Sequence, residues 1–313
     1  MSRVALSLFV LLLRAGVNFV PESEYRQRVD AIVPLEHKNE NRDLHGWRYE
    51  SIPFHAGEGL HYYYYLPGQH TELPVLLMLH GMNLDGRTFL NFRALSDRFR
   101  LIIYEFPERS NRFGGSIADF AAIVNDFTSA LGIQEVNLCG VSFGGQVVNV
   151  LMSIDVHPQI LSSVLIATPI TESKGEELKQ RKKFSDWILS LQDYELYWVM
   201  EKIFGAYLGE LSQPTRDTIK PYFRVKHPDF YRQLSRATRN FNSARAAART
   251  KAIPTLYLHG STDDLFPSMQ DDSLRKLVPQ AEIVSVKDAS HIMALTHTQT
   301  ILRHMRDFYE RAL

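Results

Sequence analysis

Short apolar runs alternate with stretches of helical periodicity along most of the chain. Six runs of four or five residues are almost continuously apolar, as expected for strands that are covered on both faces. These runs are residues 75–79, 101–104, 136–139, 164–167, 255–258 and 283–286. Apolar positions recur at helical spacing in residues 117–131, 147–154 and 298–311. The alternation predicts an α/β fold built on a doubly wound, mostly parallel sheet.

Two β-rich runs precede this pattern. They are residues 47–54 and 60–66, and they flank the turn Gly57-Glu58-Gly59. Such runs around a glycine-containing turn predict an antiparallel hairpin at the start of the sheet. Pro53 has no backbone N–H to donate to a neighbour, so we expect the first strand at an edge.

Residues 171–250 interrupt the alternation. They show no convincing strand pattern, and their apolar residues are spaced as in helices. Pro214, Pro221 and Pro228 break the stretch into segments. We therefore expect a helical insertion after the sixth strand, within a core formed by residues 47–170 and 251–313.

The N-terminal residues 1–20 hold a basic start at Arg3 and a ten-residue apolar run over residues 4–13. The run has the length of a signal-peptide core and is too short to span a bilayer unaided. Arg14 interrupts it, and no Ala-x-Ala cleavage site follows before Pro21. An export signal or short membrane anchor, with peripheral membrane contact through residues 4–13, is one interpretation, and a helix packed on a cytoplasmic protein is the second. A single membrane-spanning anchor is the third and the least favoured, because a span that continues to Val20 would bury Arg14. Residues 21–46 are polar and predict a lead-in arm with weak helical character.

The composition narrows the class of protein. Hydrophobic residues make up 45% and charged residues 22%, as in an ordinary globular protein. Lys plus Arg and Asp plus Glu both number 35, so the net charge is zero and a polycation that coats nucleic acid is not expected. Cys139 is the single cysteine, which excludes an intrachain disulfide and a zinc site with two cysteine ligands.

A glycine-rich turn follows the run at 136–139. It reads Gly140-Val141-Ser142-Phe143-Gly144 and leads into a helical pattern, which is the context of a nucleophile elbow. Side chains two positions before and after the serine would collide with neighbouring backbone, so glycine is needed there. The turn would expose the Ser142 hydroxyl and place the Phe143 N–H at a helix start, where donors favour an oxyanion. The alternative is a structural turn that happens to hold a serine.

A second turn, His80-Gly81-Met82-Asn83, follows the run at 75–79. In this position the Met82 backbone N–H can act as the second oxyanion donor, which leaves the methionine side chain free to line a pocket. The alternative is an ordinary turn at a strand end. His80 is structural under both interpretations.

An alcohol needs a base, and the base needs an orienting acid, to act as a nucleophile at neutral pH. Asp263 follows the run at 255–258, and His291 follows the run at 283–286. We predict that Asp263 is the acid and His291 the general base. Asp264 is a rival for the acid, and His297 is a weaker candidate for the base because it is expected inside the C-terminal helix.

The three groups follow the order Ser, Asp, His, each at the carboxyl end of an expected strand. In this the sequence resembles the serine-nucleophile branch of the α/β-hydrolase superfamily, over about residues 47–313. The resemblance implies Ser142 as nucleophile, His291 as base, Asp263 as acid, Met82 and Phe143 N–H groups as oxyanion hole, and no metal or organic cofactor. It also implies that the insertion at 171–250 is a cap over the site.

The sequence departs from the family at two loops. Many capped relatives carry G-x-G-x-S after the fourth strand, where this chain has Glu105-Phe106-Pro107-Glu108-Arg109-Ser110. The extended His-Gly-Gly-Gly loop of lipases is also absent. Ser142 argues against haloalkane dehalogenase and epoxide hydrolase activity, because those relatives use Asp as nucleophile.

The second half of the expected cap is strongly basic. Residues 211–251 carry a net charge of +8, which predicts either a solvated helical face or a docking surface for an anionic partner. Such a partner could be an acidic carrier protein, an anionic lipid surface or a negatively charged substrate; specific nucleic-acid binding is not expected. Aromatic residues of the cap are expected to form its core and to line an apolar acyl pocket: Trp187, Tyr194, Tyr197, Trp198, Phe204 and Tyr207.

The leading functional hypothesis is hydrolysis of a carboxylic ester of a small acyl substrate through an acyl-enzyme. The same triad could instead cleave an amide or peptide, a thioester, a lactone or a carbon–carbon bond. A catalytically silent hydrolase fold that serves as a binding module is the third hypothesis.

Overall fold

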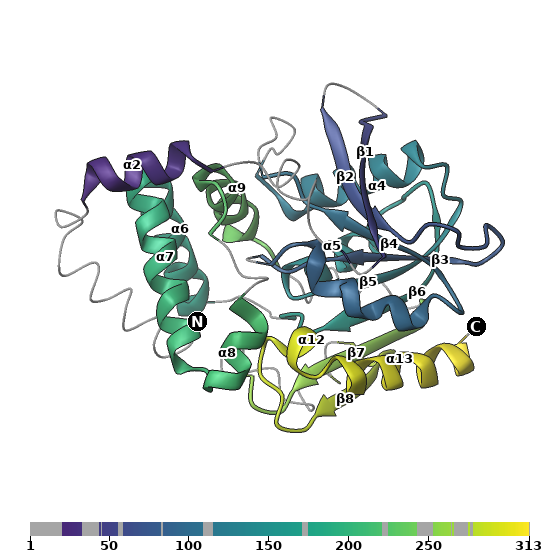
Figure 1. Cartoon of the computed structure of the whole chain (residues 1–313). Coiled ribbons are helices and arrows are strands. Elements are labelled where there is room, and N and C mark those ends of the chain that lie inside the picture. Colours follow the sequence, from purple (N-terminus) through teal and green to yellow (C-terminus); the bar gives the residue numbers. More distant parts are fainter. Residues whose placement is uncertain are drawn as a thin grey trace.

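The computed structural model contains one sheet of eight strands in the order β1-β2-β4-β3-β5-β6-β7-β8 (Figure 1). It describes residues 21–32, 44, 46–55, 59–82, 84–108, 115–170, 175–220, 225–242, 253–263, 265, 275 and 278–312. The strands are β1 (Arg48–Pro53), β2 (Leu60–Tyr65), β3 (Val75–Leu79), β4 (Arg100–Glu105), β5 (Glu135–Val141), β6 (Gln159–Ile166), β7 (Thr255–Gly260) and β8 (Glu282–Val286). The expected α/β architecture is confirmed.

The first two strands form the expected antiparallel hairpin. β1 pairs with β2, and β2 pairs antiparallel with β4, whereas the pairings from β4 through β8 are parallel. Among the described strands, β1 has a neighbour on one side only, so Pro53 lies on an edge strand as predicted.

Two cores cover the opposite faces of the sheet. Along β3, Val75, Leu77 and Leu79 face one core, and Leu76 and Met78 face the other, because successive strand side chains alternate between faces. The first core includes α4 (Ile117–Ala130) and α5 (Phe143–Leu151). The second includes η2 (Gly86–Leu95) and α13 (Thr298–Ala312).

Strand β6 begins five residues earlier than its apolar run at 164–167 suggested. Two buried serines, Ser162 and Ser163, stand in the middle of the strand, and their hydroxyls find partners on the adjacent strands. Ser162 Oγ donates to Asn137 Oδ1 at 2.6 Å, and Ser163 Oγ lies 2.9 Å from Thr255 Oγ1. Because these partners come from other strands, the apolar pattern of this segment could not reveal them.

Helices fill the described part of the chain between β6 and β7, as expected. They are α6 (Gly175–Ser190), α7 (Asp193–Glu210), α8 (Gln213–Ile219) and α9 (Pro228–Arg239). Pro214 and Pro228 stand in the first turns of α8 and α9, where a missing N–H costs no hydrogen bond. These helices lie to one side of the sheet in Figure 1.

The N-terminal arm contains a helix that docks on the helices inserted between β6 and β7, the expected cap. Helix α2 (Glu22–Asp30) lies against α7, away from the sheet (Figure 1). Tyr25 Oη donates to Glu201 Oε2 at 2.5 Å, and Arg28 Nη1 lies 2.7 Å from Glu201 Oε1. Tyr197 and Tyr194 of the cap contact the rings and guanidinium groups of this helix: the Tyr25 and Tyr197 centroids are 6.2 Å apart, and Arg26 lies over Tyr194.

The apolar run at 4–13, and with it the export or anchor hypothesis for residues 1–20, lies outside the described residues. Within the described part, no helix is long and apolar enough to cross a bilayer.

Candidate functional site

Ser142 occupies the sharp turn between β5 and α5. Its φ of 51° is in the left-handed region, which a non-glycine residue adopts only under strain. A Cβ on Gly140 would lie 2.5 Å from Gly145 N, and one on Gly144 would overlap the Leu79 carbonyl at the end of β3. Both positions therefore require glycine, for the reason the sequence indicated.

The loops that follow β7 and β8 are locked together and bring Asp263 and His291 to the same end of the sheet. Thr262 N donates to Ala289 O at 3.0 Å, and Asp288 N donates to Ser261 Oγ at 2.9 Å. A Cβ on Gly260 would lie 2.7 Å from the Ala289 carbonyl carbon, so the two loops are in close backbone contact. The loops that carry the acid and the histidine are thus joined by direct backbone contacts.

The three side chains form a hydrogen-bonded chain. His291 Nε2 lies 2.9 Å from Ser142 Oγ, and His291 Nδ1 lies 2.9 Å from Asp263 Oδ2. The Asp263 side chain is only 3% exposed, and its other oxygen accepts from Leu265 N at 3.1 Å. Because a carboxylate only accepts, Nδ1 carries the proton toward Asp263, which leaves the Nε2 lone pair facing the Ser142 hydroxyl.

The expected oxyanion donors flank Ser142. Phe143 begins α5, where backbone N–H groups have no acceptor within the helix. Gly81 lies against the elbow, since a Cβ there would be 3.6 Å from Ser142 Cβ. Met82 follows it and is 37% exposed.

The sequence offered one alternative for the acid, Asp264, and one for the base, His297. Asp264 lies outside the described residues. His297 was expected inside the C-terminal helix, and this is wrong. It lies between α12 (Met293–Thr296) and α13, which begins at Thr298. Its Nδ1 lies 2.9 Å from the hydroxyl of its neighbour Thr296.

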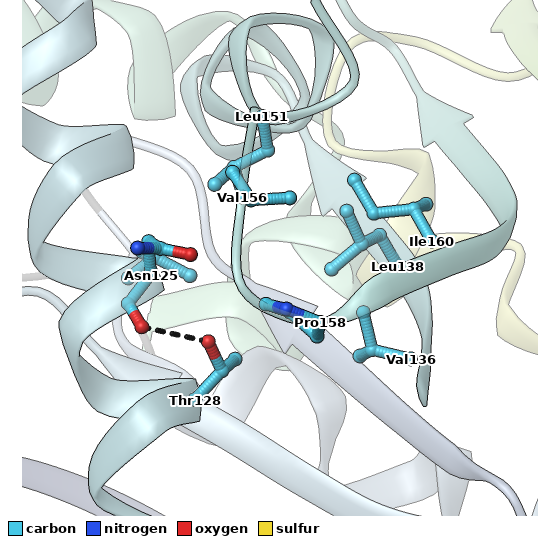
Figure 2. Close-up of a pocket in the computed structure, with 9 residues that line it drawn as sticks. Asn125, Thr128, Val136, Leu138, Leu151, Val156, Pro158 and Ile160 are labelled. Atoms are coloured by element: carbon cyan, nitrogen blue, oxygen red, sulfur yellow. Dashed lines mark hydrogen bonds between the residues drawn. The ribbon is translucent and has the colours of Figure 1, made fainter. Parts of the chain in front are cut away.

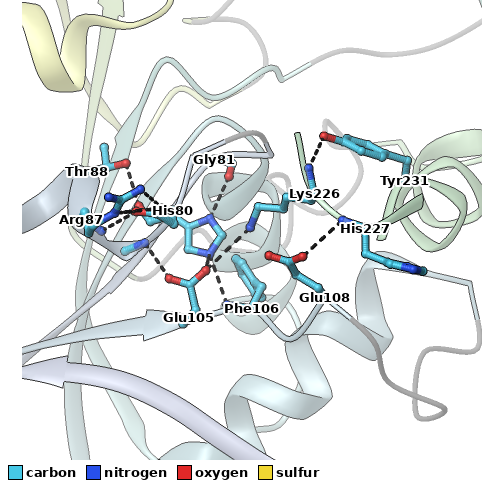
Figure 3. Close-up of polar contacts among 12 residues, drawn as sticks. His80, Gly81, Arg87, Thr88, Glu105, Phe106, Glu108, Lys226, His227 and Tyr231 are labelled. Carbon is cyan, nitrogen blue, oxygen red and sulfur yellow. Dashed lines mark hydrogen bonds and ion pairs between the residues drawn. The ribbon is translucent and has the colours of Figure 1, made fainter. Parts of the chain in front are cut away.

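A buried ionic cluster beside the loop His80–Met82, the expected oxyanion loop, was missed by sequence reasoning (Figure 3). Lys226 was counted with the basic face of the cap, but its side chain is fully buried, with Nζ 3.7 Å from Glu105 Oε1. Burial alone would raise the pKa of Glu105, but the charges of His80 and Lys226 and hydrogen bonds from His80 and the Gly86 N–H lower it to about 2. The sequence signal for this cluster was Glu105 at the end of an expected strand, followed by a loop that departs from the family pattern.

Other basic residues of the inserted helices have acidic or carbonyl partners within the same insertion. Arg232 contacts Asp193 and donates to Leu191 O at 2.7 Å, and Arg239 lies 2.8 Å from Asp186. These pairs reduce the charge available to an external anion. The anionic docking surface stays a prediction, because Arg224, Arg245, Arg249 and Lys251 lie outside the described residues.

A small apolar hollow lies near the amino ends of β5 and β6 (Figure 2). Val136 and Ile160, near the starts of β5 and β6, line it together with α4 residues such as Thr128. Thr128 Oγ1 donates to Asn125 O at 2.8 Å, so this polar group is already satisfied. Among the described residues, no group of three or more His, Cys, Asp or Glu side chains could hold a metal ion.

Comparison with known proteins finds the same fold. A carboxylesterase, YbfK of Bacillus subtilis strain 168, is 22% identical over 295 residues, which cover 86% of this chain and 91% of that protein. A thermophilic esterase from Thermogutta terrifontis superposes with a TM-score of 0.65 at 19% identity, over 85% of this chain and 99% of that one. A bacterial membrane phospholipase A superposes with a TM-score of 0.61 at 20% identity, over 100% of this chain and 99% of that one.

The family model for the alpha/beta hydrolase fold matches residues 74–298, which is most of the chain. This stretch contains the elbow, the loops that carry Asp263 and His291, and the helices between β6 and β7. The chain belongs to the α/β-hydrolase fold family.

Proposed function

We propose that the protein is a serine hydrolase that cleaves a carboxylic ester of a small acyl substrate through an acyl-enzyme intermediate. The observation that carries the proposal is the chain of two 2.9 Å contacts from Ser142 through His291 to Asp263. Within it, one imidazole nitrogen faces the serine hydroxyl and the other faces a buried carboxylate. This arrangement activates an alcohol without a metal or an organic cofactor.

Acylation begins when Ser142 Oγ attacks the carbonyl carbon of the ester. The hydroxyl proton passes to His291 Nε2, and the carbonyl electron pair moves to oxygen. The Met82 and Phe143 N–H groups stabilise that oxyanion, and Asp263 stabilises the imidazolium. When the tetrahedral intermediate collapses, the bond to the alkoxy oxygen breaks, and the leaving alcohol takes the proton from Nε2.

Deacylation repeats these steps with water as the nucleophile. His291 Nε2 takes a proton from the water as its oxygen attacks the acyl carbon. Collapse breaks the bond to Ser142 Oγ, which recovers its proton from the imidazolium. The products are a carboxylic acid and the free enzyme.

The choice of an ester rests on the likeness to a carboxylesterase over 86% of the chain. The same residues could cleave an amide, a thioester, a lactone or a carbon–carbon bond, since the steps at Ser142 are shared and only the leaving group differs. A silent binding module would not require an ordered Ser142–His291–Asp263 chain, and this argues for an active enzyme.

A panel of p-nitrophenyl esters, from acetate to palmitate, tests the proposal on the wild type and on Ser142→Ala. We expect hydrolysis by the wild type and its loss in the variant. Ser153→Ala, just beyond the far end of α5, is the matched control and should keep full activity. Retained hydrolysis in Ser142→Ala would overturn the nucleophile assignment, and a wild type inactive on every ester would overturn the choice of bond.

A further inference from the structure

The carboxyl end of β4 holds a carboxylate that contacts three parts of the molecule (Figure 3). The Glu105 side chain is 4% exposed, and its Oε2 accepts from Gly86 N at 2.8 Å. Its Oε1 lies 3.1 Å from His80 Nε2 and 3.7 Å from Lys226 Nζ. Glu105 therefore joins the start of η2, the oxyanion loop and the cap.

His80 transmits this contact to the oxyanion loop. Its Nδ1 donates to Gly81 O at 2.8 Å, and its ring is fully buried. Gly81 C=O and Met82 N–H belong to one trans peptide, in which the two bonds point in opposite directions. Holding the Gly81 carbonyl thus sets the direction of the Met82 N–H, one of the two proposed oxyanion donors.

Lys226 belongs to a cap segment that is tied to the core at the same place. The Lys226 N–H donates to Tyr231 Oη at 2.9 Å, and its ammonium lies 4.6 Å from the ring centre of Phe230. The next residue, His227, donates its N–H to Glu108 Oε2 at 3.2 Å. The cap segment before α9 is therefore seated on the loop after β4, with Lys226 reaching inward to Glu105.

Burying an ammonium and a carboxylate costs several kcal/mol per ion before their attraction is counted, so such a pair is poor evidence of a purely stabilising role. A pair of this kind is better suited to fixing one arrangement of neighbouring parts. Here the neighbouring parts are the cap and the loop that carries an oxyanion donor.

We propose that Lys226 is a positioning residue for the reaction, which fixes the Glu105 carboxylate against His80 and so aligns the Met82 N–H when the cap is seated. The inference rests on the proposed function, because it assigns Lys226 to the oxyanion hole of that reaction. It also predicts that displacing the cap segment around Lys226 would disturb the oxyanion loop.

Lys226→Met tests the inference, since methionine keeps an unbranched side chain only one atom shorter and removes the charge. Lys220→Met, the same change at an exposed cap lysine, is the matched control. The measurements are kcat and KM for the best p-nitrophenyl ester, inhibition by a trifluoromethyl ketone analogue of the same acyl chain, and the thermal midpoint. The ketone forms a tetrahedral adduct whose oxygen occupies the oxyanion hole, so it reports alignment of the donors.

We expect kcat to fall at least about tenfold in Lys226→Met with KM unchanged, less than the roughly hundred- to thousand-fold loss caused by deleting a donor outright. Inhibition by the ketone should weaken in the same proportion as kcat. Lys220→Met should match the wild type in all measurements. Unchanged kcat and unchanged ketone inhibition in Lys226→Met would overturn the inference.

A second variant separates positioning from folding. Lys226→Met leaves Glu105 without its lysine and can lower the thermal midpoint, whereas Lys226→Met with Glu105→Gln removes both charges and should restore the midpoint. We expect kcat to stay low in this double variant, and recovery of kcat together with the midpoint would show a merely structural pair. Ser142→Ala, assayed alongside, distinguishes failure of this inference from failure of the proposed function. If Ser142→Ala is inactive while Lys226→Met keeps full kcat, only the role of Lys226 is refuted. If Ser142→Ala is fully active, the proposed function is refuted, and the role of Lys226 with it.

Discussion

Replacing Asp263 by Asn is the change whose cost can be followed most closely from the structure. Asp263 Oδ2 lies 2.9 Å from His291 Nδ1, and the two side chains are 3% and 11% exposed. The substitution keeps the shape of the side chain and removes its charge. It therefore isolates the contribution of the carboxylate to the reaction.

Two effects add to the expected cost. An imidazolium and a carboxylate about 4 Å apart attract by about 4 kcal/mol at an effective dielectric constant near 20. Since about 1.4 kcal/mol changes a rate tenfold, losing this attraction lowers kcat by roughly a thousandfold. The asparagine amide can also donate to Nδ1, which moves the imidazole proton to Nε2 and leaves no lone pair there to accept the Ser142 proton. The two effects together should lower kcat by about 10⁴-fold.

The assay is kcat at saturating p-nitrophenyl ester, with circular dichroism to show that the fold is kept. Asp264→Asn is the matched control, the same change one residue along the chain. We expect the control to retain most of its activity. A kcat for Asp263→Asn within a few-fold of the wild type, or a larger loss in Asp264→Asn, would refute the assignment of Asp263 as the orienting acid.

Three further predictions follow from contacts elsewhere in the structure. Gly144→Ala should lower both the thermal midpoint and kcat because its Cβ would meet the backbone at the end of β3, whereas Gly205→Ala, with open space around it, should do neither. The pKa of Glu105 is lowered from 4.5 to about 2, so its contribution to stability is present above pH 4.5 and is lost as the pH falls toward 2; urea unfolding should show a shallower decline over this range in Glu105→Gln. Tyr25→Phe removes the hydrogen bond to Glu201, so amide hydrogen exchange in α2 should become faster by an amount equivalent to about 1 kcal/mol, while kcat is unchanged. Unaltered exchange would contradict the docking of α2 on α7.

The parts of the fold that could be predicted from the sequence are those with a local cause. Apolar runs covered on both faces predicted the central strands, and Pro53 predicted the edge. Gly140 and Gly144 predicted the elbow because their need for a missing Cβ arises within a few residues of the turn and at the adjacent strand end. The order of Ser142, Asp263 and His291 placed each at a strand end, and in a parallel sheet these ends meet.

The features that could not be predicted depend on partners distant in sequence. Lys226 resembled its basic neighbours, and only the packing of the cap on β4 shows that it is buried beside Glu105. Likewise, α2 is polar and short, and its place on α7 depends on Tyr25 and Arg28 meeting Glu201, more than 170 residues away. Periodicity carries no information about such pairs.

The most direct test of the central claim is to find which residue becomes covalently modified. The full-length protein would be treated with a fluorophosphonate, digested, and its modified peptide sequenced by mass spectrometry, with Ser142→Ala and Ser153→Ala treated in parallel. The account predicts one adduct, on Ser142, that is absent from Ser142→Ala and unchanged in Ser153→Ala. An adduct on another residue, or an unlabelled wild type, would contradict the claim that Ser142 is an activated nucleophile.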